Sequence, residues 1–209
     1  MIVPPAEAKT LTTKSRRATA LPPDERRSMI VAATLPLLLE HGDRVTSRQI
    51  AEAAGIAEGT IFRVFADKDE IIVAVIEAAL DAEPLEVALS EIPTDLTFEA
   101  RLAAAVVIIQ QRVIDVWQVM SSVGTRYHEM TRRPMVDSDA LVRLFETARS
   151  EITVEPIAAA RLLRALTLST THPMLAGEPR SPEELVQLFL HGIGTRIAHP
   201  VVDGSGPSC

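Results

Sequence analysis

The chain has 209 residues and a formal net charge of −7 at pH 7, and 47% of its residues are apolar but only 3% are aromatic. Leu, Ile, Val and Ala must therefore fill the core, and without long alternating Val/Thr/Tyr runs this mix favours an all-α fold. The single cysteine, Cys209, excludes a disulfide framework and a cysteine-based metal site within one chain. No apolar run reaches about 18 residues and no secretory signal opens the chain, so we expect a cytoplasmic protein with no membrane span.

Charge is unevenly distributed along the chain. Residues 14–68 carry nine Lys/Arg and seven Asp/Glu, whereas residues 69–209 carry eleven and twenty. Such asymmetry indicates two parts with different partners. We expect, in order, a disordered basic arm over residues 1–21, a helical DNA-binding unit over 22–66, an acidic helical domain over 67–199 and a flexible tail over 200–209.

The first expected helix runs from Pro22-Pro23 to about His41. Proline suits the first turn of a helix, and Gly42 supplies a C-terminal stop. Pro36 lies inside this span, where its ring removes a hydrogen bond and crowds the preceding turn. We therefore expect a bend or an early break at Pro36.

Residues 46–71 read TSRQIAEAAGIAEGTIFRVFADKDEI and have the pattern of two short helices across a tight turn. Thr46 can cap a helix over residues 47–54, and Gly55 permits the left-handed conformation that a tight turn needs. A second helix is expected over residues 58–65. The pair predicts a helix-turn-helix, whose second helix enters the major groove of DNA.

Several polar side chains of this unit suit contacts with DNA. Arginine binds a guanine edge or clamps a phosphate with two parallel hydrogen bonds, and Arg48 and Arg63 are the candidates for such contacts. Hydroxyl and ammonium groups suit phosphate contacts, which position a protein without reading sequence. Ser47, Thr60 and Lys68 are the candidates for this role.

The rest of the chain has the pattern of further helices. Apolar residues recur at helical spacing in its longest segment, and Ser181-Pro182-Glu183-Glu184 combines a cap, a proline and a capping acid. We expect helices from Asp67 to about Leu80, over Pro84–Glu91, from Thr97 to about Val123, from about Ser138, over Pro156–Thr171 and from Ser181 to about Ile197. Tyr127-His128-Glu129 could face a pocket, but a solvated helix end is the preferred interpretation.

The segment TSRQIAEAAGIAEGTIFRVFADKDEII is similar to the DNA-binding domain of the TetR family of transcriptional repressors. The matching features are the preceding helix that ends at Gly42, the IAEAAGI segment, the run Gly59-Thr60-Ile61-Phe62, and Phe65 and Lys68. The resemblance covers residues 24–78 and implies a ligand-responsive regulator that binds DNA as a homodimer. It also implies DNA contacts from Gly59 and Phe62.

Three positions of the DNA-binding unit affect how it would hold DNA. The family usually has Tyr at the place of Phe62 and often His at the place of Val64, and both can donate a hydrogen bond to phosphate, whereas Phe and Val cannot. Glu58 places an acid at the start of the recognition helix, where it can accept from cytosine or repel phosphate. We expect weaker binding, or more dependence on the N-terminal arm.

The resemblance also implies an effector pocket among the central helices. Trp117, the only tryptophan, either fills the core or forms a wall of that pocket. Apolar neighbours in the expected helices extend the set of candidate ligand-binding residues, which is Ile109, Val113, Trp117, Met120 and Phe145. The effector is expected to be a small apolar or amphipathic molecule.

The segments VEPIAAARLLRAL and SPEELVQLFLHGI look like the dimerising C-terminal helices of the family. Leu185, Phe189 and Ile193 lie on one face of the last helix and Val186, Leu190 and Ile197 on another, so one face remains to be covered by a second copy.

The five histidines lack the spacing of metal ligands, and there is no phosphate-binding loop or nucleophile elbow. No cofactor and no catalytic residue are expected. The alternative is an all-helical enzyme or protein-interaction module that retains the helix-turn-helix as a scaffold.

Overall fold

A computed structural model describes residues 22–134, 136–178 and 180–192 of the chain. Every regular element in these ranges is helical, which confirms the all-α prediction. The expected arm over residues 1–21 and the expected tail over residues 200–209 lie outside the described residues. The elements are α1 (Pro23–His41), the 3-10 turn η1 (Gly42–Arg44), α2 (Ser47–Ala53), α3 (Glu58–Ile61), α4 (Lys68–Leu80), α5 (Glu83–Ser90), α6 (Phe98–Ser122), α7 (Thr125–Met130), α8 (Asp139–Glu146), the 3-10 turn η2 (Arg149–Glu151), α9 (Pro156–Thr171) and α10 (Pro182–His191).

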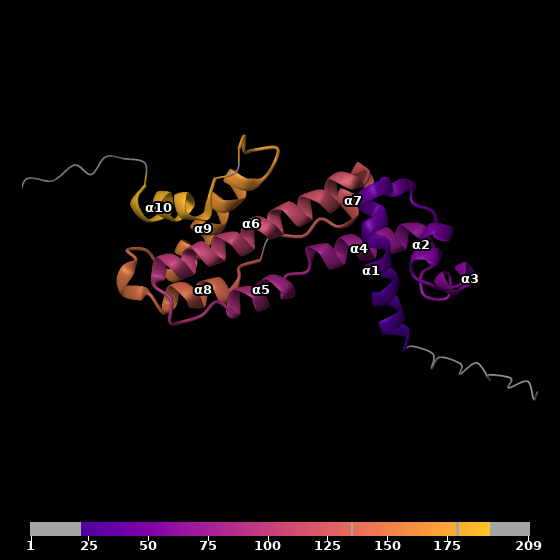
Figure 1. The fold of residues 1–209 in the computed structure, drawn as a ribbon, viewed down its shortest axis with the longest axis horizontal. Coiled ribbons are helices and arrows are strands. Elements are labelled where there is room, and N and C mark those ends of the chain that lie inside the picture. Colours follow the sequence, from indigo (N-terminus) through magenta and orange to yellow (C-terminus); the bar gives the residue numbers. More distant parts are fainter. Residues whose placement is uncertain (1–21, 135, 179, 193–209) are drawn as a thin grey trace, which may run out of the picture.

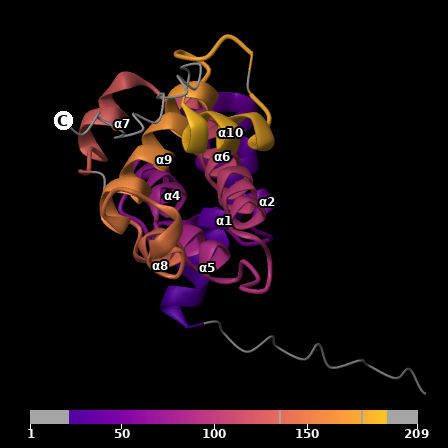
Figure 2. The same ribbon diagram turned by 90° about the vertical axis from the view of Figure 1, so that its left-hand side faces the viewer.

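Helix α6 is the axis of the molecule. Figure 1 shows α1, α2 and α3 gathered at one end and α8, α9 and α10 at the other, with α6 running between them. At the end of the molecule that holds the C-terminal helices, α6 packs against α5, α9 and α10. Helix α8 packs beside them, against α5 and α9. Figure 2 views this end and shows α5, α6, α8 and α9 grouped together. A single helix therefore connects the part that precedes α4 to the C-terminal helices.

Two hydrophobic cores lie along α6. Leu102, Val106 and Ile109 belong to the C-terminal core, which α5, α8, α9 and α10 complete. Val119 and Val123, further along the same helix, belong to the N-terminal core with side chains of α1 to α4. Each fully buried Leu, Ile or Val contributes about 1.5–3 kcal/mol relative to exposure. A movement of α6 would therefore be felt in both cores.

Side-chain caps begin the helices where the sequence predicts them. In each case an oxygen of the capping side chain accepts a hydrogen bond from the backbone N–H three residues later, which is worth about 1 kcal/mol. The caps are Thr46, Asp67, Thr97, Ser138 and Ser181. Thr46 and Ser181 form full capping boxes with Gln49 and Glu184.

Two expectations for the N-terminal helices differ from the structure. Helix α1 continues through Pro36, so the early break does not occur, and Thr34 and Leu38 are buried on either side of the proline and hold both halves in the core. Helix α3 ends at Ile61 rather than near residue 65. The N–H groups of both Val64 and Phe65 bond to the Ile61 carbonyl, so the chain tightens into a turn that brings Phe65 into the core.

The last helix is also shorter than expected. It ends at His191, because Gly192 adopts a φ of 70° and its N–H bonds back to Leu188. Both apolar faces of its first turns pack on the chain's own core: Leu185 and Val186 are buried, and Phe189 and Leu190 are partly buried. Ile193 and Ile197, the expected continuation of the two faces, lie outside the described residues.

The N-terminal core extends beyond the boundary expected at residue 66. It includes Ile71, Ile72, Val75 and Ile76, because α4 buries one face against α1. Helix α4 thus packs with the segment that precedes it while its N-terminal turn faces the end of α6.

Helix α6 is long and apolar enough to cross a membrane by length and composition, and it alone meets that test among the described residues. A central helix of a folded domain meets the same test. In this structure α6 packs against α1, α4, α5, α9 and α10, and 28% of its apolar 18-residue stretch is buried.

Candidate nucleic-acid interface

The helix pair α2–α3 is built as the sequence predicts up to Ile61. The Thr46 hydroxyl oxygen accepts from the Gln49 N–H at 3.3 Å, and the Gln49 side chain accepts from the Thr46 N–H at 2.9 Å. Gly55 has a φ of 66°, which a side chain would strain, and so allows the tight turn between the helices. Ile50 and Ile61 are buried beneath the pair. We call residues 47–65 the reading unit.

The two candidate base-reading arginines are free to meet a ligand. Arg48 in the first turn of α2 and Arg63 just after α3 are both exposed. Neither makes an ion pair or side-chain hydrogen bond with another residue in the described parts of the chain. Gly59 and Phe62 are exposed on the same unit, and Thr60 is half-buried. Exposed, unpaired guanidinium groups on a short helix pair are what direct readout in a DNA groove requires.

Glu58 is held by a neighbour rather than left free. The Ser47 hydroxyl donates to its carboxylate and so links the first residue of α2 to the first residue of α3. One carboxylate oxygen of Glu58 remains available to accept from a base. Ser47, expected at a phosphate, has its hydroxyl committed to this bond in the structure.

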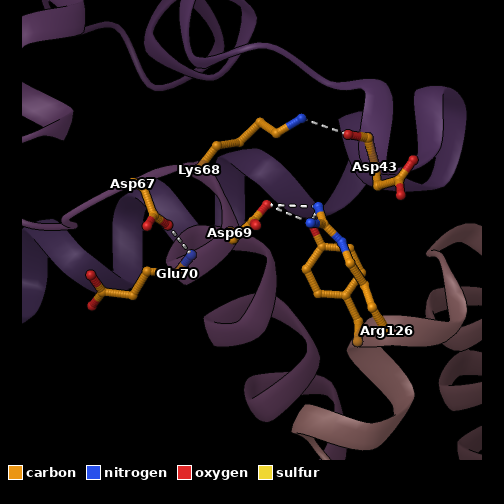
Figure 3. A network of polar contacts seen from close by, with 7 residues as sticks. Asp43, Asp67, Lys68, Asp69, Glu70 and Arg126 are labelled. Atoms are coloured by element: carbon orange, nitrogen blue, oxygen red, sulfur yellow. Dashed lines mark hydrogen bonds and ion pairs between the residues drawn. The ribbon is translucent and has the colours of Figure 1, made fainter.

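Lys68 is only partly available for phosphate. Its ammonium donates to the backbone carbonyl of Asp43 at 2.7 Å, which ties the start of α4 to η1 (Figure 3). Three hydrogens are present on a lysine ammonium, so two remain for other acceptors. The side chain thus stabilises the fold at the position where the sequence predicts a DNA contact.

A clamp closes the end of the reading unit. The Arg27 guanidinium lies 4.2 Å from the Phe65 ring centre and donates to the Glu70 carboxylate at 3.0 Å. The same carboxylate accepts from the Ala66 N–H at 2.6 Å, while the Glu70 N–H donates to the capping side chain of Asp67. These contacts, first the Ala66 N–H and then Arg27, lower the pKa of Glu70.

The C-terminal end of α6 approaches the reading unit's domain very closely. A Cβ on Gly42 would lie 2.7 Å from the Ser122 carbonyl oxygen, and Gly42 itself has a φ of 62°. Only glycine fits this position, so the residue that ends α1 also lets α6 pack against that end. Gly124 lies close to Asp43 in the same region.

Helix α7, which the sequence did not predict, completes this junction. The hydroxyl of Tyr127 donates to the Asp69 carboxylate at 2.7 Å, and Arg126 donates to the same oxygen at 2.9 Å. Tyr127 is fully buried, which together with Asp69 raises its pKa to about 12. The expectation of a solvated helix end is therefore wrong for Tyr127. One signal was present in the sequence: it is the chain's only tyrosine.

The candidate effector residues do not share one site. Ile109 and Phe145 are buried in the C-terminal core, and Val113 packs against it. Met120 packs against the N-terminal core instead. The structure thus divides the candidates between two cores.

Trp117 lies between these groups and is half-buried. Its ring meets the edge of the His172 ring, with centroids 4.6 Å apart. Thr171, the last residue of α9, is buried, and its hydroxyl has no hydrogen-bond partner in the described parts of the chain. A separate groove of about 480 Å³ opens between α1 and α4, and none of the candidate effector residues lines it.

A compact helix pair with unpaired arginines, joined through one long helix to a second helical core, defines a helix-turn-helix DNA-binding regulator. Residues 30–75 match the family described as "Bacterial regulatory proteins, tetR family". The N-terminal domain belongs to this TetR family, as the sequence resemblance predicts, and the chain as a whole has the fold of TetR-family transcriptional regulators.

Solved structures of the same fold share little sequence with the chain. A TetR/AcrR-family regulator from Thermobifida fusca is 20% identical, with a TM-score of 0.57, and the match covers 82% of this chain and 100% of that one. The fatty acid degradation regulator FadR from Bacillus halodurans is 16% identical, with a TM-score of 0.53 and coverage of 86% and 100%. LfrR from Mycobacterium smegmatis, solved in complex with proflavine, is 20% identical, with a TM-score of 0.50 and coverage of 82% and 98%. No curated protein matches the chain at a significant level.

Proposed function

We propose that the chain is a homodimeric repressor that binds a pseudo-palindromic operator through α2 and α3 and responds to a small apolar or amphipathic effector. The observation that carries the DNA-binding part is the pair of exposed, unpaired arginines, Arg48 and Arg63, on the reading unit. Two equivalent readers related by a two-fold axis require two equivalent half-sites, which is why the operator should be a pseudo-palindrome.

The proposed dimer contact is formed by α9 and α10. Leu162 is 55% exposed and Ile157 is 42% exposed on α9, and these two side chains supply the apolar part of the surface. Helix α10, whose Phe189 and Leu190 pack on the chain's own core, lies beside α9 and would complete a four-helix bundle with a second copy. The exposed Glu183 and Gln187 on α10 give this surface a polar rim.

The proposed effector site lies around Trp117. Its half-buried ring and the unpartnered hydroxyl of Thr171, next in the chain to His172, supply an apolar wall and one polar handle. LfrR, one of the structural neighbours, was solved in complex with proflavine, which supports a ligand-binding role for this fold. Ile109, Val113, Met120 and Phe145 would join such a site only if the packing of the cores opened.

In vitro selection from a random duplex library tests the function directly. Wild-type protein should enrich sequences that contain two inverted half-sites, and the variant with both Arg48→Ala and Arg63→Ala should not. Enrichment of no common sequence by the wild-type protein, or equal enrichment by the double variant, would contradict the proposed function.

A further inference from the structure

Three consecutive side chains in the first turn of α4 hold three different parts of the molecule. Lys68 reaches η1, Asp69 reaches α7, and Glu70 reaches both α1 and the backbone at the end of the reading unit. Figure 3 shows Lys68 directed to η1 and Asp69 to Arg126 from this one turn. Because the three residues share a single helical turn, a change at one contact moves the other two.

Of these three contacts, only the one made by Asp69 connects α4 to α7, the helix that follows α6 in the chain. Asp69 Oδ1 accepts from both Tyr127 and Arg126, and the Arg126 guanidinium also lies 4.5 Å from the Tyr127 ring centre. The Tyr127 ring is fully buried and belongs to the N-terminal core. Because the ring is buried, the position of its hydroxyl, which binds Asp69 of α4, is fixed.

We propose that Tyr127 and Arg126 are positioning residues for DNA binding, which set the angle of α4 and the reading unit on α6. Tyr127 is wholly buried, so it cannot itself contact DNA. The inference rests on the proposed dimeric function. In a dimer the two reading units must fall on half-sites about 34–36 Å apart, so a small rotation of α4 at each end changes which half-site spacing fits.

The contacts of the neighbouring Glu70 link the orientation of α4 to that of the reading unit. Glu70 follows Asp69 directly and holds the Ala66 N–H, one residue after the buried Phe65. A bond at Asp69 thus fixes the same helical turn that fixes the end of the reading unit. With that bond lost, each reading unit keeps its own structure but its orientation on α6 is less defined.

Tyr127→Phe tests the proposal, because it removes only the hydroxyl and keeps the buried ring. The probes are the duplex selected by the wild-type protein, the same duplex with its spacer changed by one or two base pairs, and a duplex with a single half-site. We expect the affinity for the selected duplex to fall about two- to tenfold, as for loss of one hydrogen bond. The preference for its spacing should fall as well, while the affinity for the single half-site stays unchanged.

Arg126→Gln, at an exposed position, should act in the same direction and guards against a folding defect in the first variant. Arg149→Gln is the matched control, because it removes an exposed ion pair with Glu155 that lies wholly in the C-terminal part. Wild-type spacing preference in both α7 variants overturns the proposal, as does an equal loss on the single half-site and the full duplex. Failure of the wild-type protein to select paired half-sites would instead refute the proposed function.

Discussion

The guanidinium of Arg27 lies 4.2 Å from the centre of the Phe65 ring and donates at 3.0 Å to Glu70. One side chain from the first helix thus covers the last buried residue of the reading unit and pairs with the first turn of α4. This arrangement holds the short α3 in place, although α3 itself has only the four residues Glu58–Ile61. Helices this short are not stable alone, so the orientation of the reading unit depends on such contacts.

Arg27→Ala should therefore loosen the reading unit. We expect a loss of about 1 kcal/mol in the free energy of unfolding, from a partly exposed cation–π contact and ion pair. Urea unfolding at neutral pH measures this loss. Arg149→Ala removes the ion pair with Glu155 together with hydrogen bonds to the Ile152 and Val154 carbonyls, all at an exposed arginine of the C-terminal part, and should cost less. Wild-type stability of Arg27→Ala would show that its contacts with Phe65 and Glu70 contribute nothing.

Glu70 gives a pH-dependent prediction. The Ala66 N–H and Arg27 lower its pKa in the folded protein below the ordinary value of 4.5. A lowered folded-state pKa means that the stabilisation is present in full above pH 4.5 and is lost as the pH falls through the folded-state value. The stability difference between wild type and Glu70→Gln should thus shrink on acidification. A difference that stays constant between neutral pH and pH 3.5, the latter on the order of one unit below the model-peptide value, would contradict this.

Gly42 and Gly55 form a matched pair. Both have positive φ values, 62° and 66°, but only Gly42 faces a neighbour, the Ser122 carbonyl at 2.7 Å from a built Cβ. Gly55→Ala should cost about 1–2 kcal/mol from backbone strain alone. Gly42→Ala should cost more, because the end of α6 must also shift. Thermal or urea unfolding of both variants measures the difference, and equal costs would show that α6 yields freely at this contact.

The sequence predicts these features unequally well. Caps such as Thr46 and Ser181 bond to backbone three residues away, so local pattern is sufficient to find them. The Tyr127–Asp69 bond joins residues 58 apart, and no local pattern encodes that pairing. The early end of α3 is likewise decided by burial of Phe65 and not by helix propensity. The position of Arg48 in the first turn of α2 follows from the local helix-turn-helix pattern, whereas the junction residues are specific to the packing of this chain.

The reading unit should lose DNA affinity when its free arginines are removed. Arg48→Ala and Arg63→Ala should each cost about 1–3 kcal/mol of binding on the selected duplex if the residue reads a base. Lys68→Ala should reduce the salt slope by about one on all sequences, and because it also removes the bond to the Asp43 carbonyl it should relax the preference for half-site spacing as well. Fluorescence anisotropy at several salt concentrations measures both effects. Wild-type affinity in the double arginine variant would place the interface elsewhere.

The proposed dimer surface predicts which substitutions change the molar mass of the protein in solution. Leu162→Glu places a charge on the most exposed apolar position of α9 among the described residues and should favour the monomer, because a buried unpaired charge is costly. Val107→Glu, at a comparably exposed position on α6, is the control and should leave the mass unchanged. Light scattering at micromolar concentration distinguishes the two. A wild-type protein that is monomeric under these conditions would refute the dimer.

Effector binding at the proposed site can be measured through the fluorescence of Trp117. An effector can change DNA affinity only if it binds one arrangement of the two reading units better than the other, and a coupling of about 1–3 kcal/mol corresponds to roughly a five- to 150-fold change. A molecule from a panel of amphipathic compounds that weakens operator binding should also change Trp117 fluorescence. Trp117→Ala and Thr171→Val should each weaken its binding while leaving the DNA affinity of the ligand-free protein near wild type, because one removes the apolar wall and the other the unpartnered hydroxyl. Leu175→Ala, an exposed side chain in the loop that follows α9, is the control. If both site variants keep the wild-type response, Trp117 is a packing residue, and the groove between α1 and α4 becomes the next place to search.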